Sequence, residues 1–149
     1  MTTKEYLLSV KRLDNMINDK LDEIYRVKTR SINITVPCDR ERVDGTHCND
    51  RIGEQVTDIV EMEKDVDLLT DIRVDTIRHI KKICKQINPI HADILEKHYI
   101  DYLSFSQIGT IYGFKIGKTK YICKEAQKEF EKIFITTKCS IPIDFDRYM

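Results

Sequence analysis

The hydrophobic positions near the start of the chain recur in alternating steps of four and three residues. The seam runs through Tyr6, Val10, Leu13, Ile17, Leu21, Ile24 and then Val27 or Lys28. This spacing puts one apolar stripe on a helix and predicts a helix over residues 3–30. Thr2 or Thr3 can cap its start, and Glu5 stands close to the capping-box position. Because only one side is apolar, we expect this helix to need a partner.

A second, longer seam predicts a helix over residues 49–86, with Asp50 as a plausible N-cap. It runs through Ile52, Val56, Ile59, Met62, Val66, Leu69, Ile72, Thr76 or Ile77, Ile80, Cys84 and Ile87. The pair Asn88-Pro89 then stops the helix. A single stripe of this length packs antiparallel on the first helix, as a long helical hairpin, or on another chain, as a homodimer. The pattern leaves both arrangements open.

The stretch between these helices has a different character. At residues 31–50, Ile32, Ile34 and Val36 alternate with polar residues, as in a short strand, but an isolated strand is unstable. We interpret the stretch as a long connecting loop.

After Pro89 the spacing predicts three shorter helices, over residues 89–102, 104–112 and 115–134. The positions expected to point inward are Ile90, Ile94, Leu95, Tyr99, Ile116, Ile122, Ala126, Phe130 and Ile133. Residues 136–149 are left as a tail. The predicted fold is therefore all-α, with a helical hairpin over residues 1–87 and a three-helix domain over residues 88–135.

Composition supports long helices, and the charge is unevenly distributed. The chain has only five Gly and three Pro in 149 residues, and its formal net charge is zero. Residues 54–75 nevertheless hold eight acids and two bases, a net charge of −6, whereas residues 115–128 hold five Lys and one Glu, a net charge of +4. A local basic patch says more about partners than the overall sum does.

The basic segment lies within a pattern typical of a helix-turn-helix. Ser104 is a hydroxyl cap, and Ile108-Gly109 pairs an apolar residue with a small one where two helices can touch. Gly113 suits the turn because it tolerates a positive φ, and an apolar residue follows it directly. The next helix offers apolar positions at Ile116, Thr119 and Ile122 or Cys123. The predicted core of the motif consists of Ile108, Gly109, Gly113 and Ile122.

The remaining face of the second helix carries the predicted chemistry. It offers Lys115, Lys118, Lys120, Tyr121, Lys124 and Lys128, together with Gly117. Lysines crowded on one short helix repel each other unless they meet an anion such as a DNA phosphate. Residues near the start of this helix would reach base edges in the major groove, and the others would contact phosphates. The sequence thus predicts binding to double-stranded DNA.

The same residues resemble a known motif and a known family. The run Leu95-Glu-Lys-His-Tyr99, then Ser104, Ile108-Gly109 and Tyr112-Gly113, resembles the C-terminal helix-turn-helix of sigma factor region 4. Over residues 4–130 the chain resembles a family of small phage and prophage proteins from low-GC Gram-positive bacteria. The matching stretches are Lys4-Glu-Tyr-Leu7, Arg12-Leu-Asp-Asn-Met-Ile17, Glu41-Arg-Val43, Ile59-Val-Glu-Met-Glu63 and His98-Tyr99. This resemblance implies a phage-encoded transcriptional regulator, similar to phage late-gene activators.

The chain departs from that pattern in three places. Lys115 stands where such motifs usually have a Ser cap, and Gly109 replaces a common Ala, at a cost of up to about 1 kcal/mol in helix propensity. The tail after Ile135 has no counterpart.

Two other functions fit the same residues. The chain would also suit a protein-interaction module that binds RNA polymerase or another regulator without gripping DNA, with the acidic helix meeting a basic partner. In a structural coiled coil, the lysine face would merely be solvated.

Other classes of function find little support. We expect no catalytic residues, because no nucleophile elbow, base or Gly-rich loop accompanies the paired carboxylates. We expect no metal or cofactor, since Cys38, His47 and Cys48 lack a familiar zinc spacing. No apolar run approaches the roughly 18 residues of a membrane span. With no leader pattern and an odd number of Cys, we expect a cytoplasmic protein, and the resemblance implies a bacterial host cell.

Overall fold

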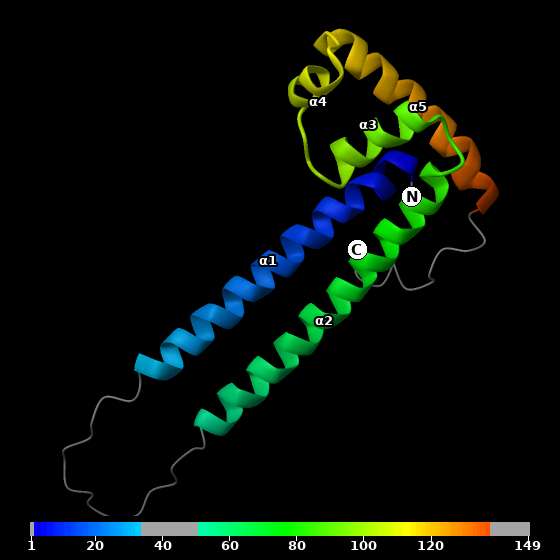
Figure 1. The fold of residues 1–149 in the computed structure, drawn as a ribbon. Coiled ribbons are helices and arrows are strands. Elements are labelled where there is room, and N and C mark those ends of the chain that lie inside the picture. The colour runs from blue at the N-terminus through cyan, green and yellow to red at the C-terminus, as the bar shows by residue number, and fades with distance from the viewer. Residues whose placement is uncertain (1, 34–50, 138–149) are drawn as a thin grey trace, which may run out of the picture. The chain divides into compact units, whose positions relative to one another are not determined.

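The computed structural model describes residues 2–33 and 51–137, and all regular secondary structure in these ranges is helical (Figure 1). The helices are α1 (Thr3–Asn33), α2 (Arg51–Cys84), α3 (Pro89–Tyr99), α4 (Phe105–Tyr112) and α5 (Ile116–Thr137). The all-α prediction is confirmed. None of the helices in this part of the chain has the length and apolar character that crossing a membrane requires.

The chain divides into two compact units. Unit 1 comprises Met1–Asp14 and Ile72–Met149, and unit 2 comprises Asn15–Asp71. Unit 1 therefore takes in the first turns of α1 and the last turns of α2 as well as α3, α4 and α5. The sequence predicts a domain boundary near residue 87, whereas the boundaries between the two units fall after Asp14 and after Asp71.

Unit 1 is built around one apolar core to which all five helices contribute. Its buried residues are Tyr6, Leu7, Val10, Ile80, Ile83, Cys84, Ile94, Leu95, Tyr99, Ile108, Cys123, Ala126, Phe130 and Phe134. Leu7 and Ile83 lie off the predicted seams. Each is buried because the ends of α1 and α2 pack against α3–α5 as well as against each other, so a broader face of each helix is covered.

Unit 2 consists of the remaining parts of α1 and α2. Ion pairs join Lys20 to Asp65 (3.5 Å) and Lys28 to Glu63 (2.7 Å), so the two segments run in opposite directions. Ile24 and Leu69 are buried.

Two seam positions of this unit were predicted wrongly. Leu21 is 47% exposed and Val56 is 53% exposed. In a unit of only two helices, each helix can bury no more than the narrow side that faces the other. Dimerisation through the same seams stays a prediction.

Helix ends differ from the predictions at several points. Helix α1 continues to Asn33, so Ile32 is helical and not part of a strand. Helix α2 ends at Cys84, before Asn88, whose side chain instead caps α3 by accepting a hydrogen bond from Ile90 N (3.0 Å). Helix α5 extends three residues beyond its predicted end, to Thr137.

Helix α3 ends at Tyr99, three residues early, because Tyr102 in the following loop adopts φ +57°, which a helix does not allow. The predicted cap Asp50, most of the connecting loop, and tail residues 138–149 lie outside the described residues.

Candidate nucleic-acid interface

Helix α4 begins with a complete capping box. Ser104 Oγ accepts a hydrogen bond from Gln107 N (3.3 Å), and Gln107 Oε1 accepts one from Ser104 N (2.9 Å). Two backbone donors that a helix start would leave unpaired are thereby satisfied. An eight-residue helix is too short to be stable alone, so this cap fixes where α4 starts.

Helix α4 ends in a Schellman motif, which sets the direction of the turn into α5. Gly113 has φ +67°, and its N–H reaches the carbonyl of Thr110 (3.4 Å), while Phe114 N donates to Gly109 O (2.8 Å). The left-handed conformation favours glycine. The predicted role of Gly113 in the turn agrees with this geometry.

Gly109 lies where α4 meets the start of α5. A Cβ atom built on Gly109 would stand 2.6 Å from Phe114 O and 3.2 Å from Thr119 Oγ1. Thr119 is completely buried, and its hydroxyl donates to Lys115 O (3.3 Å). A glycine at this position is thus required by the close approach of the turn and α5.

The core of the motif is only partly as predicted. Ile108 is completely buried, and of the two alternatives in α5 Cys123 is buried, whereas Ile122 is half-buried. Ile116 and Ile90, both expected inward, are 50% and 49% exposed. Ile116 is the first residue of α5, and the short α4 meets α5 at the level of Thr119, which leaves half of the Ile116 side chain in solvent. Ile90 lies in the first turn of α3, before the buried stretch that starts at Ile94.

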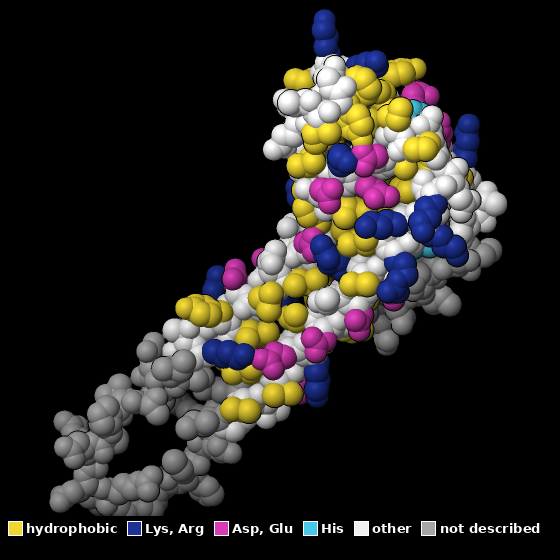
Figure 2. Space-filling model, viewed as in Figure 1, with side chains coloured by type: hydrophobic (Ala, Val, Ile, Leu, Met, Phe, Trp, Pro, Cys, Tyr) yellow, Lys and Arg dark blue, Asp and Glu magenta, His cyan; other side chains and the backbone are white. Residues whose placement is uncertain are grey.

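All six predicted DNA-contacting residues are exposed. They are Lys115, Lys118, Lys120, Tyr121, Lys124 and Lys128. Figure 2 shows Lys and Arg side chains projecting from the end of unit 1 where α4 meets α5 and from the outer side of α5. These six residues are called the α5 face below.

Helix periodicity decides which members of the α5 face point the same way. At 100° per residue, Tyr121 lies opposite the buried stripe of Thr119, Cys123 and Ala126. Tyr121 is 65% exposed, so its ring stands at the centre of the face. Lys118 lies on one flank of it, and Lys124 lies on the other.

The charges of these lysines are not equally available. Lys128 pairs with Glu125 (3.1 Å), one turn away on the same helix, and Lys118 Nζ lies 4.3 Å from the centroid of the Phe114 ring. In the part of the chain that the structure describes, Lys115, Lys120 and Lys124 have no ion pair. The positive charge of these three lysines is therefore open to a partner.

A groove adjoins the α5 face and includes residues that the sequence did not single out for DNA contact. It has a volume of about 290 Å³ and is lined by Lys4, His98, Tyr99, Phe105, Lys120, Cys123, Lys124 and Gln127. Lys4 and Gln127 are the additions that matter chemically. Lys4 stands more than a hundred residues away in sequence, so no local pattern could have placed it beside α5.

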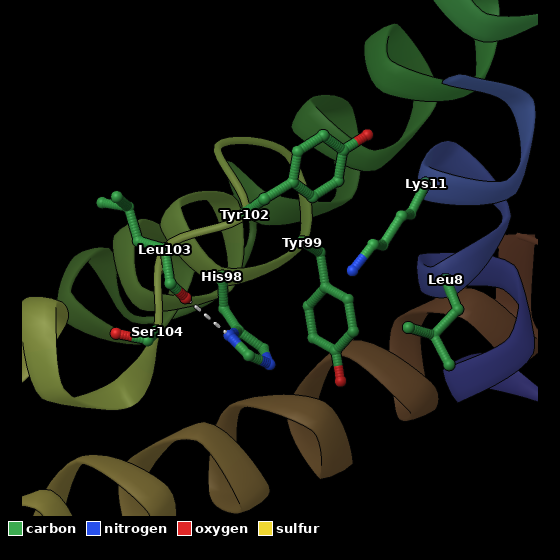
Figure 3. A pocket seen from close by; sticks show the side chains of 7 residues that line it. All are labelled: Leu8, Lys11, His98, Tyr99, Tyr102, Leu103 and Ser104. Carbon is green, nitrogen blue, oxygen red and sulfur yellow. Dashed lines mark hydrogen bonds between the residues drawn. The ribbon is translucent and has the colours of Figure 1, made fainter. Parts of the chain in front are cut away.

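A smaller cavity of about 160 Å³ shares His98 and Tyr99 with this groove, and Figure 3 shows the residues that line it. His98 Nδ1 lies 3.0 Å from Leu103 O, and Lys11 reaches in from α1 toward Tyr99 and Tyr102. Tyr102 donates a hydrogen bond to Asp14 of α1. These contacts hold the loop that precedes α4 against the start of α1.

Tyr99 presents a neutral hydroxyl to this region. Burial raises the pKa of Tyr99 to about 12, so the phenol stays protonated at neutral pH. Its oxygen accepts a hydrogen bond from Gln127 Nε2 at 2.7 Å. The groove therefore contains polar groups and cations but no carboxylate.

Comparison of the chain with family models, with curated proteins and with solved structures found no match. Among residues 2–33 and 51–137 there is also no cluster of three His, Cys, Asp or Glu side chains that could hold a metal ion. Cys38, His47 and Cys48 lie outside those ranges. The functional argument therefore rests on the geometry of α4, its turn and α5.

Proposed function

We propose that this protein binds double-stranded DNA with α5 in the major groove and regulates transcription. The observation that carries the proposal is the α5 face itself. Unpaired lysines and an exposed tyrosine surround the first turns of a helix that follows a tightly fixed turn. The major groove is wide enough for one helix, and a helix-turn-helix presents the start of its second helix to the bases.

The residues of the α5 face divide into two roles under this proposal. Lys115 directly precedes α5, and Lys118 and Tyr121 lie in its first two turns. These three side chains would reach base edges, where a lysine can donate to guanine O6 and N7. Lys120, Lys124 and Lys128 would contact phosphates, which position the protein without reading sequence. The exposed side chain of Ile116 adds an apolar group that suits a thymine methyl.

Gly117 supports the same arrangement. It is exposed, and a Cβ built there would meet nothing within 4 Å, so packing does not demand a glycine at this position. Its lack of a side chain lets the backbone of α5 approach another surface closely. The role as a phage-encoded regulator comes from the family resemblance, and the DNA contact comes from this geometry.

A salt titration tests the DNA contact. Binding of the full chain to random-sequence duplex DNA should weaken steeply with salt, because each lysine–phosphate contact releases counterions. A Lys118→Ala/Lys124→Ala variant should bind more weakly and with a shallower slope of log affinity against log salt. An Arg26→Ala/Lys64→Ala variant removes the same charge from exposed positions of unit 2 and should keep the wild-type slope. Equal slopes for all three proteins would contradict the proposal.

An interaction module is the second candidate, favoured by the acidic side of α2. Asp58, Glu61, Asp67 and Asp71 are exposed and have no ion pair within the described ranges. Such a surface suits a basic patch on a protein such as RNA polymerase. Binding to purified bacterial RNA polymerase without DNA, lost in an Asp67→Asn/Asp71→Asn variant, would support this function.

A further inference from the structure

The groove beside the α5 face is lined by three lysines, which come from the two separate segments of the chain that form unit 1. Lys120 and Lys124 lie one turn apart on α5, and Lys4 comes from the first turn of α1 (Figure 1). No aspartate or glutamate lines the groove. Lysines that line one groove with no carboxylate among them repel each other, and a bound anion would relieve the repulsion.

The acid nearest to Lys4 in sequence is already engaged. Glu5 Oε2 accepts a hydrogen bond from Thr2 N (2.7 Å), and Thr2 Oγ1 accepts one from Glu5 N (3.3 Å). This capping box holds the pKa of Glu5 below its usual value, first through the bond from the Thr2 backbone. The carboxylate of Glu5 thus serves the start of α1. Lys4 itself is exposed and makes no ion pair with the described residues.

The lining of the groove suits a phosphodiester. Phe105 stacks on His98 with ring centroids 4.2 Å apart, which gives the groove an aromatic side. The Gln127 amide donates to the Tyr99 hydroxyl (2.7 Å) and so holds that neutral polar group beside the lysines.

We propose that this groove binds a backbone phosphate of the DNA and that Lys4 is a third anchor beside Lys120 and Lys124. The inference rests on the proposed function, because Lys120 and Lys124 belong both to the α5 face and to the groove. Lys124 lies on one flank of the α5 face. A DNA strand that passes along this flank would therefore reach Lys4 next. The start of α1 then forms part of the DNA interface, although α1 lies outside the helix-turn-helix.

The test is the salt slope of a Lys4→Gln variant of the full chain on random-sequence duplex DNA. Loss of one phosphate contact should lower the slope of log affinity against log salt by about 0.9 and weaken binding equally for unrelated sequences. A Lys4→Arg variant should restore the wild-type slope. A Lys11→Gln variant removes the same charge two turns along α1, outside the groove, and should leave the slope unchanged.

Each outcome separates this inference from the proposed function. Wild-type binding that depends on Lys118 and Lys124 but not on Lys4 would overturn the inference and leave the function standing. No binding by the wild type at low salt would overturn both. If inorganic phosphate shifts the NMR signals of the Lys4 side chain while Lys4→Gln leaves DNA binding unchanged, the groove binds a free anion and the inference is wrong. Thermal melts of each variant serve as the control for folding. We expect an unchanged melting temperature, because the Lys4 side chain is exposed.

Discussion

Single residues at the turn determine how closely α4 and α5 approach each other. Gly109 is the clearest case, because the atom that its Cβ would meet is the backbone oxygen of Phe114, which cannot turn aside like a side chain. Phe114 N also donates to Gly109 O, so a backbone hydrogen bond holds the two residues at this close separation. The glycine costs helix propensity but permits the contact that orients the α5 face.

A Gly109→Ala variant should therefore be less stable than the wild type. Overpacking typically costs about 1–3 kcal/mol, and better helix propensity returns up to about 1 kcal/mol, so the free energy of unfolding should fall by up to about 2 kcal/mol. Gly117→Ala is the matched control, because its Cβ would meet nothing within 4 Å, and its stability should be unchanged or slightly higher. Chemical denaturation of both variants measures the difference. A Gly109→Ala protein as stable as Gly117→Ala would show that the contact is not tight.

At the scale of the elements, the capping box of α4 secures the helix that supports α5. Replacing Ser104 with Ala removes the acceptor for Gln107 N and should lower the free energy of unfolding by about 1 kcal/mol. Ser106→Ala, at an exposed position two residues further on, should change it by less than about 0.5 kcal/mol. Urea denaturation followed by circular dichroism measures both. Equal values for the two variants would mean that the cap does not contribute to stability.

Element by element, the sequence predicted what local patterns control. The caps at Thr2 and Ser104, the turn at Gly113 and the existence of all five helices follow from spacing and residue type. What it could not predict depends on contacts between distant segments. Leu7 is buried because the start of α1 joins the core of unit 1, and a periodic seam carries no information about a second neighbour.

In the candidate site, too, local patterns could be predicted from the sequence and contacts between distant segments could not. The exposed lysines of α5 were predicted from their spacing around the apolar positions. The groove was not, because Lys4 approaches Lys120 and Lys124 only through the tertiary fold. Ile116 was assigned to the inside from helical register alone, although a residue in the first turn of a helix can lie beyond the end of its packing partner.

At the scale of the whole molecule, unit 1 contains both the α5 face and the start of α1, whereas the acidic side of α2 lies largely in unit 2. This separation explains how a chain of zero net charge can present a cationic surface to DNA. Each unit has an exposed tyrosine that can serve as a probe position. Tyr121 is 65% exposed on the α5 face, and Tyr25 is 71% exposed in unit 2.

Photo-cross-linking from these two positions tests the central claim most directly. The full chain would carry p-benzoylphenylalanine in place of Tyr121 or of Tyr25 and be irradiated with duplex DNA at low salt. We expect a covalent protein–DNA product from position 121, lost when salt is raised, and little or none from position 25. Cross-linking from position 25 alone, or from both positions equally, would contradict the assignment of DNA binding to α5.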